Sequence, residues 1–169
     1  MTSTVAEPTT DEVERATTLE LFLDLVFVFT VTQLTGLVSH PSGPADYGKA
    51  ALVLGMTWWM YDGFVWLTGN LSMDRSGYRM GVFAGMAGFL MMALAIPGVF
   101  GATAASADNA LVFGLAYLGV TILHTGLFAT APNTSAQAIW RLAPFNLAGA
   151  LLVLVAAFLP DEWRWVAWL

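Results

Sequence analysis

The chain lacks most of the residues on which metal sites and covalent catalysis depend. None of its 169 residues is a cysteine, which excludes disulfides, thiol catalysis and cysteine-based metal sites. Only two histidines are present, His40 and His124, and they form no ligand cluster, so no metal site is predicted. The sequence also shows no clear nucleophile set. We therefore expect neither an enzyme nor a bound cofactor.

Charge is scarce as well. Lys and Arg together number six, and scattered over the chain they make no stripe that tracks phosphates, so nucleic-acid binding is not expected. Charged residues make up 11% of the chain and hydrophobic residues 57%, with a mean hydropathy of +0.69, whereas soluble domains contain about 25% charged residues. This composition predicts a membrane protein whose main partner is the lipid bilayer.

What the chain does contain is a series of long apolar segments with short breaks rich in Pro, Gly and Asn. Each segment is about long enough to cross a bilayer as a helix. We predict an all-α, multi-pass transmembrane bundle with five complete helices and the start of a sixth. The helices are expected at about 17–38, 47–69, 80–100, 109–130 and 136–159, with Asp108 opening the fourth and the sixth beginning in WRWVAWL at 163–169.

Two further expectations concern the ends of the chain. Residues 1–16 are acidic and polar and predict a disordered tail. The transmembrane domain then occupies 17–169 and is expected to be truncated at its C-terminus, because the last apolar segment is short. Four basic residues fall on the side of the tail and two on the other side, which favours a cytoplasmic N-terminus by the positive-inside rule.

Glu20 and Asp24 are the most informative residues, because both lie inside the first apolar segment. Residues four apart share a helix face, so both carboxylates point toward protein or a wet cavity rather than lipid. Glu20 is equally compatible with a position at headgroup level, where it would suit the helix dipole. Asp24 lies deeper, so its structural alternative requires protonation or a fixed ion pair.

The second segment presents one aromatic and acidic face. At about 100° per residue, its members lie within roughly 60° of Asp62. Such a face is typical of helix packing, and it is also compatible with a substrate cavity or with a bound cation. The residues on this face are Gly55, Trp58, Trp59, Asp62, Trp66 and Gly69.

Tyr117, Thr121 and His124 form a polar stripe on the fourth segment. His124 is more typical of a hydrogen-bonded packing residue than of a proton relay, and both roles stay open. In the fifth segment, Arg141 is the basic residue within reach of buried carboxylates. We expect it to pair with Asp24 or Asp62, because charges inside a membrane are usually compensated.

Small residues in the third segment predict close helix packing. Gly81 and Gly85 form one GxxxG spacing, and Ala84 and Gly88 form the same pattern. The pattern is common in membrane helices and indicates no particular partner.

The run Glu20-Leu21-Phe22-Leu23-Asp24-Leu25-Val26-Phe27-Val28 resembles the opening signature of the bacterial low temperature requirement A family, with Leu23 in place of a second Phe. The Trp58-Trp59 pair, Trp66 to Asn70 and the Tyr117 to His124 segment are similar too. This resemblance implies a multi-pass protein of the bacterial inner membrane, named for growth in the cold, whose members are usually longer.

The first segment is also similar, more weakly, to the first helix of a lysosomal and bacterial potassium-channel family. The shared residues are Arg15 and the Phe22-x-Asp24-x-Val26-Phe27 run, although the Arg-to-Phe spacing differs. By this resemblance, Asp24 would be a structural hydrogen-bonding hub beside a pore.

Three functional hypotheses follow, in order of preference. Transport or permeation of an ion or small solute, linked to growth at low temperature, suits ionisable residues concentrated on helix faces. A non-transporting membrane stress or signalling component is the alternative, and an intramembrane enzyme is the least supported. A homo-oligomer is left open.

Overall fold

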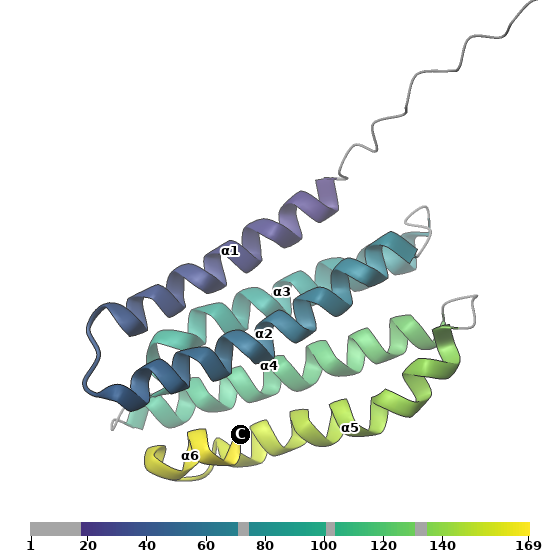
Figure 1. Ribbon diagram of the computed structural model, residues 1–169. Coiled ribbons are helices and arrows are strands. Elements are labelled where there is room, and N and C mark those ends of the chain that lie inside the picture. The colour runs from purple at the N-terminus through teal and green to yellow at the C-terminus, as the bar shows by residue number, and fades with distance from the viewer. Residues whose placement is uncertain (1–17, 71–74, 101–103, 131–134) are drawn as a thin grey trace, which may run out of the picture.

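The chain folds into a bundle of long helices (Figure 1). The computed structural model describes residues 18–70, 75–100, 104–130 and 135–169, and within these ranges it contains six helices and no strand. The tail predicted at 1–16 lies outside the described residues. The helices are α1 (Thr18–Ser39), α2 (Pro44–Asn70), α3 (Ser76–Val99), α4 (Ala104–Ala129), α5 (Ser135–Ala156) and α6 (Asp161–Ala167).

The predicted all-α bundle is confirmed, and the first five helices lie within a few residues of their predicted bounds. One boundary was wrong. Helix α4 begins at Ala104, so Asp108 lies inside the helix rather than opening it. Helix α3 ends at Val99, within one residue of its predicted end, with Pro97 in its last turn.

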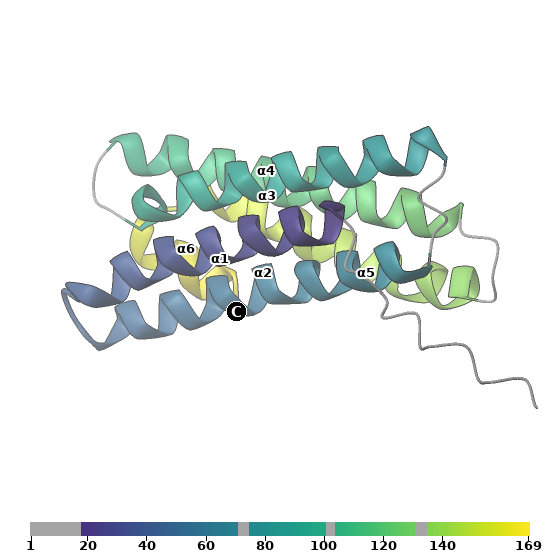
Figure 2. The same ribbon diagram turned by 90° about the horizontal axis from the view of Figure 1, so that it is seen from above.

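Helices α3 and α4 form the centre of the bundle and make its most extensive contact. Helix α1 packs on α3, α5 packs on α4, and α2 lies along α1 and α4. In consequence α1 and α5 lie at opposite edges of the molecule in Figure 1, and Figure 2 looks down on the bundle from the side of α1. Pro144 lies inside α5, which accounts for the bend of that helix in Figure 1.

Glycines allow the central helices to approach closely. A Cβ atom at Gly81 would lie 2.7 Å from Leu127 on α4, and one at Gly88 would lie 2.4 Å from Val120. A Cβ atom at Gly85 would likewise lie 2.4 Å from the Phe64 ring on α2. Close packing is therefore confirmed at Gly81 and Gly85, whereas Ala84 is exposed and plays no part in it.

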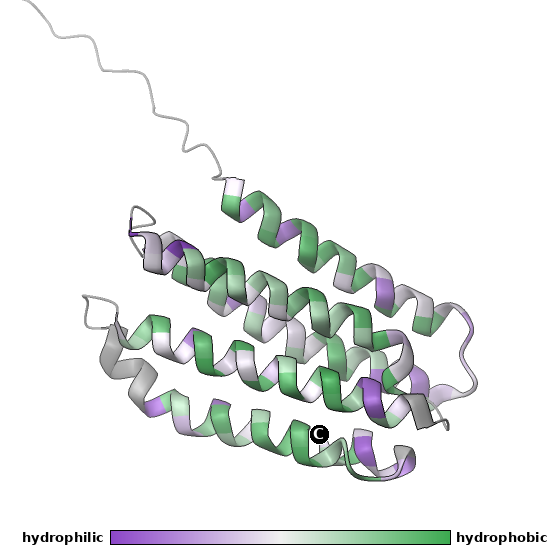
Figure 3. Ribbon diagram, turned by 180° about the vertical axis from the view of Figure 1, so that it is seen from behind, coloured by the Kyte–Doolittle hydropathy of each residue, from purple (hydrophilic) through white to green (hydrophobic). Residues whose placement is uncertain are grey.

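The surface of the bundle is apolar, as a bilayer requires. Hydrophobic positions dominate the helices in Figure 3, and large apolar side chains such as Leu21, Leu94 and Phe145 are exposed. Within the described ranges, three helices are long and apolar enough to cross a membrane: α1, α3 and α4. Half of the apolar window of α3 is buried against 22% of that of α1, so α1 offers most of its surface to whatever surrounds the bundle.

The last segment packs against the rest of the bundle. Helix α6 has seven residues, and the chain after α5 turns back along it (Figure 1). Trp168 is buried, stacks on Phe113 with ring centroids 5.3 Å apart, and donates from its indole N–H to the Val153 carbonyl at 3.1 Å. In the described chain, Trp168 thus packs α6 against α4 and α5.

Candidate intramembrane polar site

Asp24 meets the tyrosine that precedes Asp62. The Tyr61 hydroxyl on α2 donates a hydrogen bond to the Asp24 Oδ1 on α1, which joins two helices that make only a modest contact otherwise. Asp24 and Asp62 are both exposed, and within the described ranges neither forms an ion pair. We call Asp24, Tyr61 and Asp62 the acidic face.

Aromatic rings hold Tyr61 in place. Phe27 stacks on Tyr61 with centroids 4.2 Å apart, and it contacts Trp58 edge to face with centroids 5.9 Å apart. Stacked and edge-to-face pairs are worth about 0.5 to 1.5 kcal/mol beyond burial. The ring of Tyr61 is thereby positioned so that its hydroxyl reaches the Asp24 carboxylate.

The acidic face is poorly suited to lipid. A carboxylate costs about 2.5 to 3.5 kcal/mol at the centre of a membrane helix and less toward its ends, and here two are exposed on adjoining helices. The surrounding exposed side chains of α1 are apolar, among them Leu21, Leu25 and Val28. In the membrane, this face therefore requires water, protein or a bound cation beside it.

His124 occupies the opposite side of α2. Its side chain is 6% exposed and lies between two phenylalanines, with ring centroids 5.5 Å from Phe64 and 4.7 Å from Phe128. A Cβ atom at Gly63 would come within 2.6 Å of the His124 Nε2. Only glycine at position 63 lets the imidazole lie this close to the backbone of α2.

The hydrogen bonding of the His124 ring is incomplete. Both ring nitrogens of His124 are buried and form no hydrogen bond in the structure, and the hydroxyl of Thr125 is in the same condition. Nearby Thr121 differs, because its hydroxyl donates to the Tyr117 carbonyl at 2.8 Å. Buried polar atoms without a partner are rare and often mark functional positions or bound water.

The polar residues of the spans share one end of the bundle. Asp24 and Arg141 each lie six residues after the start of their helix, and Asp62 and His124 lie eight and five residues before the end of theirs. Because these helices alternate in direction, all four of those ends are at the same side of the bundle (Figure 1). At 1.5 Å per residue, the four side chains branch from the helices about 8 to 12 Å inside that side.

The expected pairing of Arg141 was wrong. Arg141 is exposed on α5, and within the described ranges the ion pair is that between Lys49 and Asp46, at 3.3 Å. Helix α5 packs on α4 at one edge of the molecule while α1 forms the opposite edge. The intervening helices separate the guanidinium from both carboxylates.

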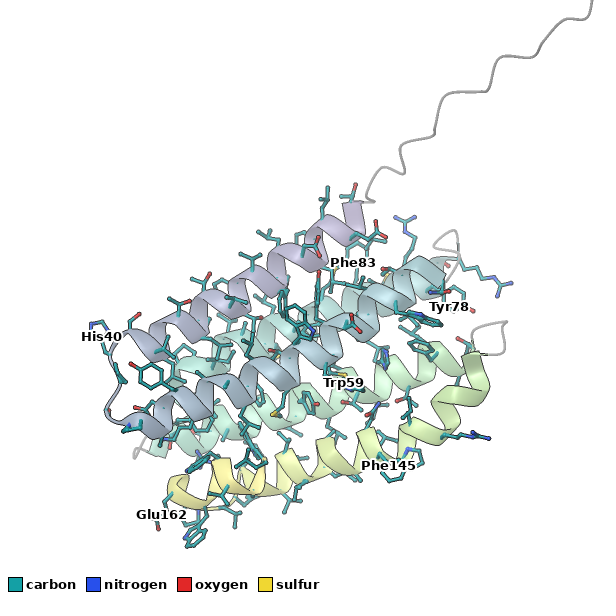
Figure 4. All side chains as sticks on the ribbon, viewed as in Figure 1. His40, Trp59, Tyr78, Phe83, Phe145 and Glu162 are labelled. Carbon is teal, nitrogen blue, oxygen red and sulfur yellow. The ribbon has the colours of Figure 1, made fainter. Side chains whose placement is uncertain are left out.

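The other predicted residues have varied positions. Glu20 lies half-buried in the first turn of α1. Tyr117 is buried and stacks on Phe113 at 6.4 Å, as a packing residue would. The face predicted around Asp62 is exposed along its whole length, with Trp59 pointing away from the core (Figure 4), and Trp66 stacks on Phe128 at 4.6 Å. The tryptophans lie on the outer surface and not in an internal cavity.

The roles of two residues, Tyr61 and Arg164, were not predicted from the sequence. Tyr61 lies about 100° around the helix from Asp62 and so fell outside the face we counted, although its hydroxyl inside an apolar segment was a signal. Arg164 was counted only as a loop charge. It is in fact 3% exposed and donates to the carbonyls of Val99, Ala157 and Leu159 at 2.7, 3.5 and 3.2 Å.

Across the part of the chain that the structure describes, no group of three or more His, Asp or Glu side chains is arranged to hold an ion. The acidic face supplies two carboxylates and a hydroxyl, a set that suits a proton or a weakly held monovalent cation better than a tightly coordinated metal.

Comparison with known proteins gives a family. Residues 15–169 match the family model of the bacterial low temperature requirement A protein. A curated relative, an uncharacterized protein from Rhizobium meliloti (strain 1021), is 30% identical over 110 residues, which cover 65% of this chain and 25% of that relative. No solved structure matches. Because the family model covers nearly the whole chain, including the acidic face, this protein belongs to the bacterial low temperature requirement A family.

Proposed function

We propose that this protein moves a small cation, a proton or an alkali metal ion, across the bacterial inner membrane, and that the acidic face forms one wall of the path. The observation that carries the proposal is the exposure of two carboxylates, Asp24 and Asp62, on adjoining helices with apolar surroundings. Ionisable groups inside a membrane usually mark ion or substrate paths. The proposal assigns no catalytic chemistry to the chain.

Each residue of the acidic face has a part in this proposal. The Asp24 carboxylate would hold the cation, with the Tyr61 hydroxyl fixing its orientation through the hydrogen bond between them. Asp62 would supply a second negative charge one residue further along α2. The exposed indole ring of Trp58 lies close by, and aromatic rings attract cations through their ring electrons.

His124 suits a proton path in particular. An imidazole titrates near neutral pH, and both nitrogens of His124 lack hydrogen-bond partners. Gly63, beside Asp62 in the sequence, is in direct contact with that ring. Residues 62–63 of α2 therefore lie between the acidic face and His124. Protonation of one site would change the electrostatic potential at the other.

Orientation and physiology complete the proposal. The distribution of basic residues favours a cytoplasmic N-terminus, which would place the polar end of the bundle toward the cytoplasm. Cation movement would serve growth at low temperature, the property for which the family is named. This match covers a quarter of the Rhizobium relative's length, and the activity of a longer family member would include segments beyond those described.

Flux measurements in proteoliposomes test the proposal. Potassium, sodium and proton flux would be recorded for the natural chain, for Asp24→Asn and for Asp46→Asn, a matched control with the same chemical change at the other end of the bundle. We expect flux in the natural chain and the control, and its loss in Asp24→Asn at unchanged thermal stability. Absence of flux from a folded, inserted protein would instead favour a stress or signalling component.

A further inference from the structure

Within the described residues, no side chain covers the two carboxylates of the acidic face on their outer side. Asp24 and Asp62 are exposed, and their helices present lipid-compatible side chains on either side. A cover of suitable chemistry would be a membrane helix that is apolar apart from a positive charge at the same depth. Such a surface is present elsewhere on this molecule.

That surface is the outer side of α5. Arg141 is exposed there, and its neighbours Leu142 and Phe145 are 49% and 77% exposed. Figure 4 shows Phe145 at the edge of the bundle that α5 forms. An arginine facing hydrocarbon is unfavourable, as an exposed aspartate is, so a partner of the opposite charge would stabilise the outer side of α5.

The two surfaces match in depth as well as in charge. Asp24 and Arg141 each lie six residues after the start of a helix, and both helices start at the same end of the bundle. The apolar neighbours match too, since Val28 and Phe145 each lie ten residues after those starts. Helices α1 and α5 occupy opposite edges of one molecule (Figure 1), so Arg141 and Asp24 do not meet within it.

We infer that copies of this chain assemble head to tail in the membrane, with Arg141 on α5 of one copy beside Asp24 and Asp62 on the acidic face of the next. Contacts of this heterologous kind close into a ring when the rotation between copies permits. Arg141 offsets one of the two carboxylate charges at each contact. The assembly stands on complementary surfaces and does not depend on transport.

Cross-linking tests the assembly, because the chain has no natural cysteine. Two differently tagged copies, one with Val28→Cys and one with Phe145→Cys, would be co-expressed and oxidised in the membrane. We expect the mixed disulfide dimer to exceed either homotypic dimer by roughly tenfold. Homotypic Val28→Cys dimers in excess would show a two-fold, face-to-face contact and overturn the inference, as would no cross-link at all.

Charge substitution gives an independent measurement. Arg141→Gln is expected to weaken self-association in detergent roughly tenfold, the change that about 1.4 kcal/mol produces, as measured by light scattering across a concentration series. Arg75→Gln removes the same charge from an exposed position at the start of α3 and should leave association unchanged. Arg141→Lys keeps the charge and should retain most of it. Equal behaviour of Arg141→Gln and Arg75→Gln would overturn the inference.

Discussion

Arg164 and His124 are both buried, and they lie at opposite ends of the bundle in different circumstances. The Arg164 guanidinium donates to three backbone carbonyls, among them that of Val99 at the end of α3, where a positive charge also suits the helix dipole. The His124 ring has no hydrogen bond to either nitrogen. A buried polar group with several hydrogen bonds stabilises a structure, whereas a buried polar group with none lowers stability.

The largest change in the free energy of unfolding is expected on substitution of Arg164. Arg164→Ala leaves three carbonyls without their donor and should lower the free energy of unfolding by about 3 kcal/mol, measured by chemical unfolding in detergent. Arg79→Ala, an exposed control, should change it by less than about 0.5 kcal/mol. Equal losses in the two variants would contradict the structural role of Arg164.

The second-largest loss of stability is expected at the contact between α2 and α4. Gly63→Ala places a methyl group against the His124 ring, which Phe64 and Phe128 prevent from moving aside. We expect a loss of about 1 to 3 kcal/mol, typical of overpacking, in thermal unfolding. Gly55→Ala is the control on the same helix, because nothing lies within 4 Å of its added carbon, and it should be neutral or stabilising by up to about 1 kcal/mol.

Substitution of His124 tests whether its contribution to stability differs from that of Arg164. His124→Leu removes buried polar atoms that have no partner and is expected to raise the free energy of unfolding by about 1 kcal/mol or leave it unchanged, while it abolishes proton flux. Unfolding and flux are measured on the same preparation. A variant that lost stability as Arg164→Ala does would show that His124 is a packing residue with unseen partners.

A smaller effect is expected where α1 and α2 meet. Tyr61→Phe keeps the ring stacked on Phe27 but removes the hydroxyl that donates to Asp24, which should cost about 0.6 kcal/mol, the average for polar contacts between membrane helices. A double-mutant cycle with Asp24→Asn isolates the pair. Strictly additive effects would show that the hydrogen bond contributes nothing.

The smallest effect concerns Asp46, in the first turn of α2. The backbone N–H of Ser42, 2.7 Å from Oδ2, together with Lys49, lowers the pKa of this carboxyl below its usual 3.8. Its contribution to stability is therefore full above pH 3.8 and is lost as the pH falls through the lower folded value. Melting temperatures of the natural chain and of Asp46→Asn should converge only at the acid end of a titration; a constant difference would refute this assignment.

Local patterns in the sequence predicted the helices well because each depends on a single stretch of chain. Apolar length, prolines and glycine spacing are local signals, and they located five helices and the close approach at Gly81 and Gly85. The exception is the start of α4. Asp108 is a typical residue for a helix start, but the helix begins at Ala104, where packing of α4 on α3 outweighs the local preference.

The candidate site was predicted only in part. Asp24, Asp62 and His124 were recognisable, since ionisable residues in apolar segments are unusual wherever they fold. Their partners were not, because the hydrogen bond from Tyr61 and the separation of Arg141 from the acidic face depend on which helices adjoin. Helical periodicity places a residue on a face of its own helix but carries no information about the neighbour.

The sequence by itself thus determined the class of this protein, its helices, its family signature and its ionisable intramembrane residues, because composition and periodicity act within one segment. Tertiary structure alone decided that Arg164 joins the ends of two helices, that Asp24 binds Tyr61, and that Arg141 lies on the far edge of the bundle. These outcomes depend on the packing of separate helices, where close approach of small residues sets the arrangement.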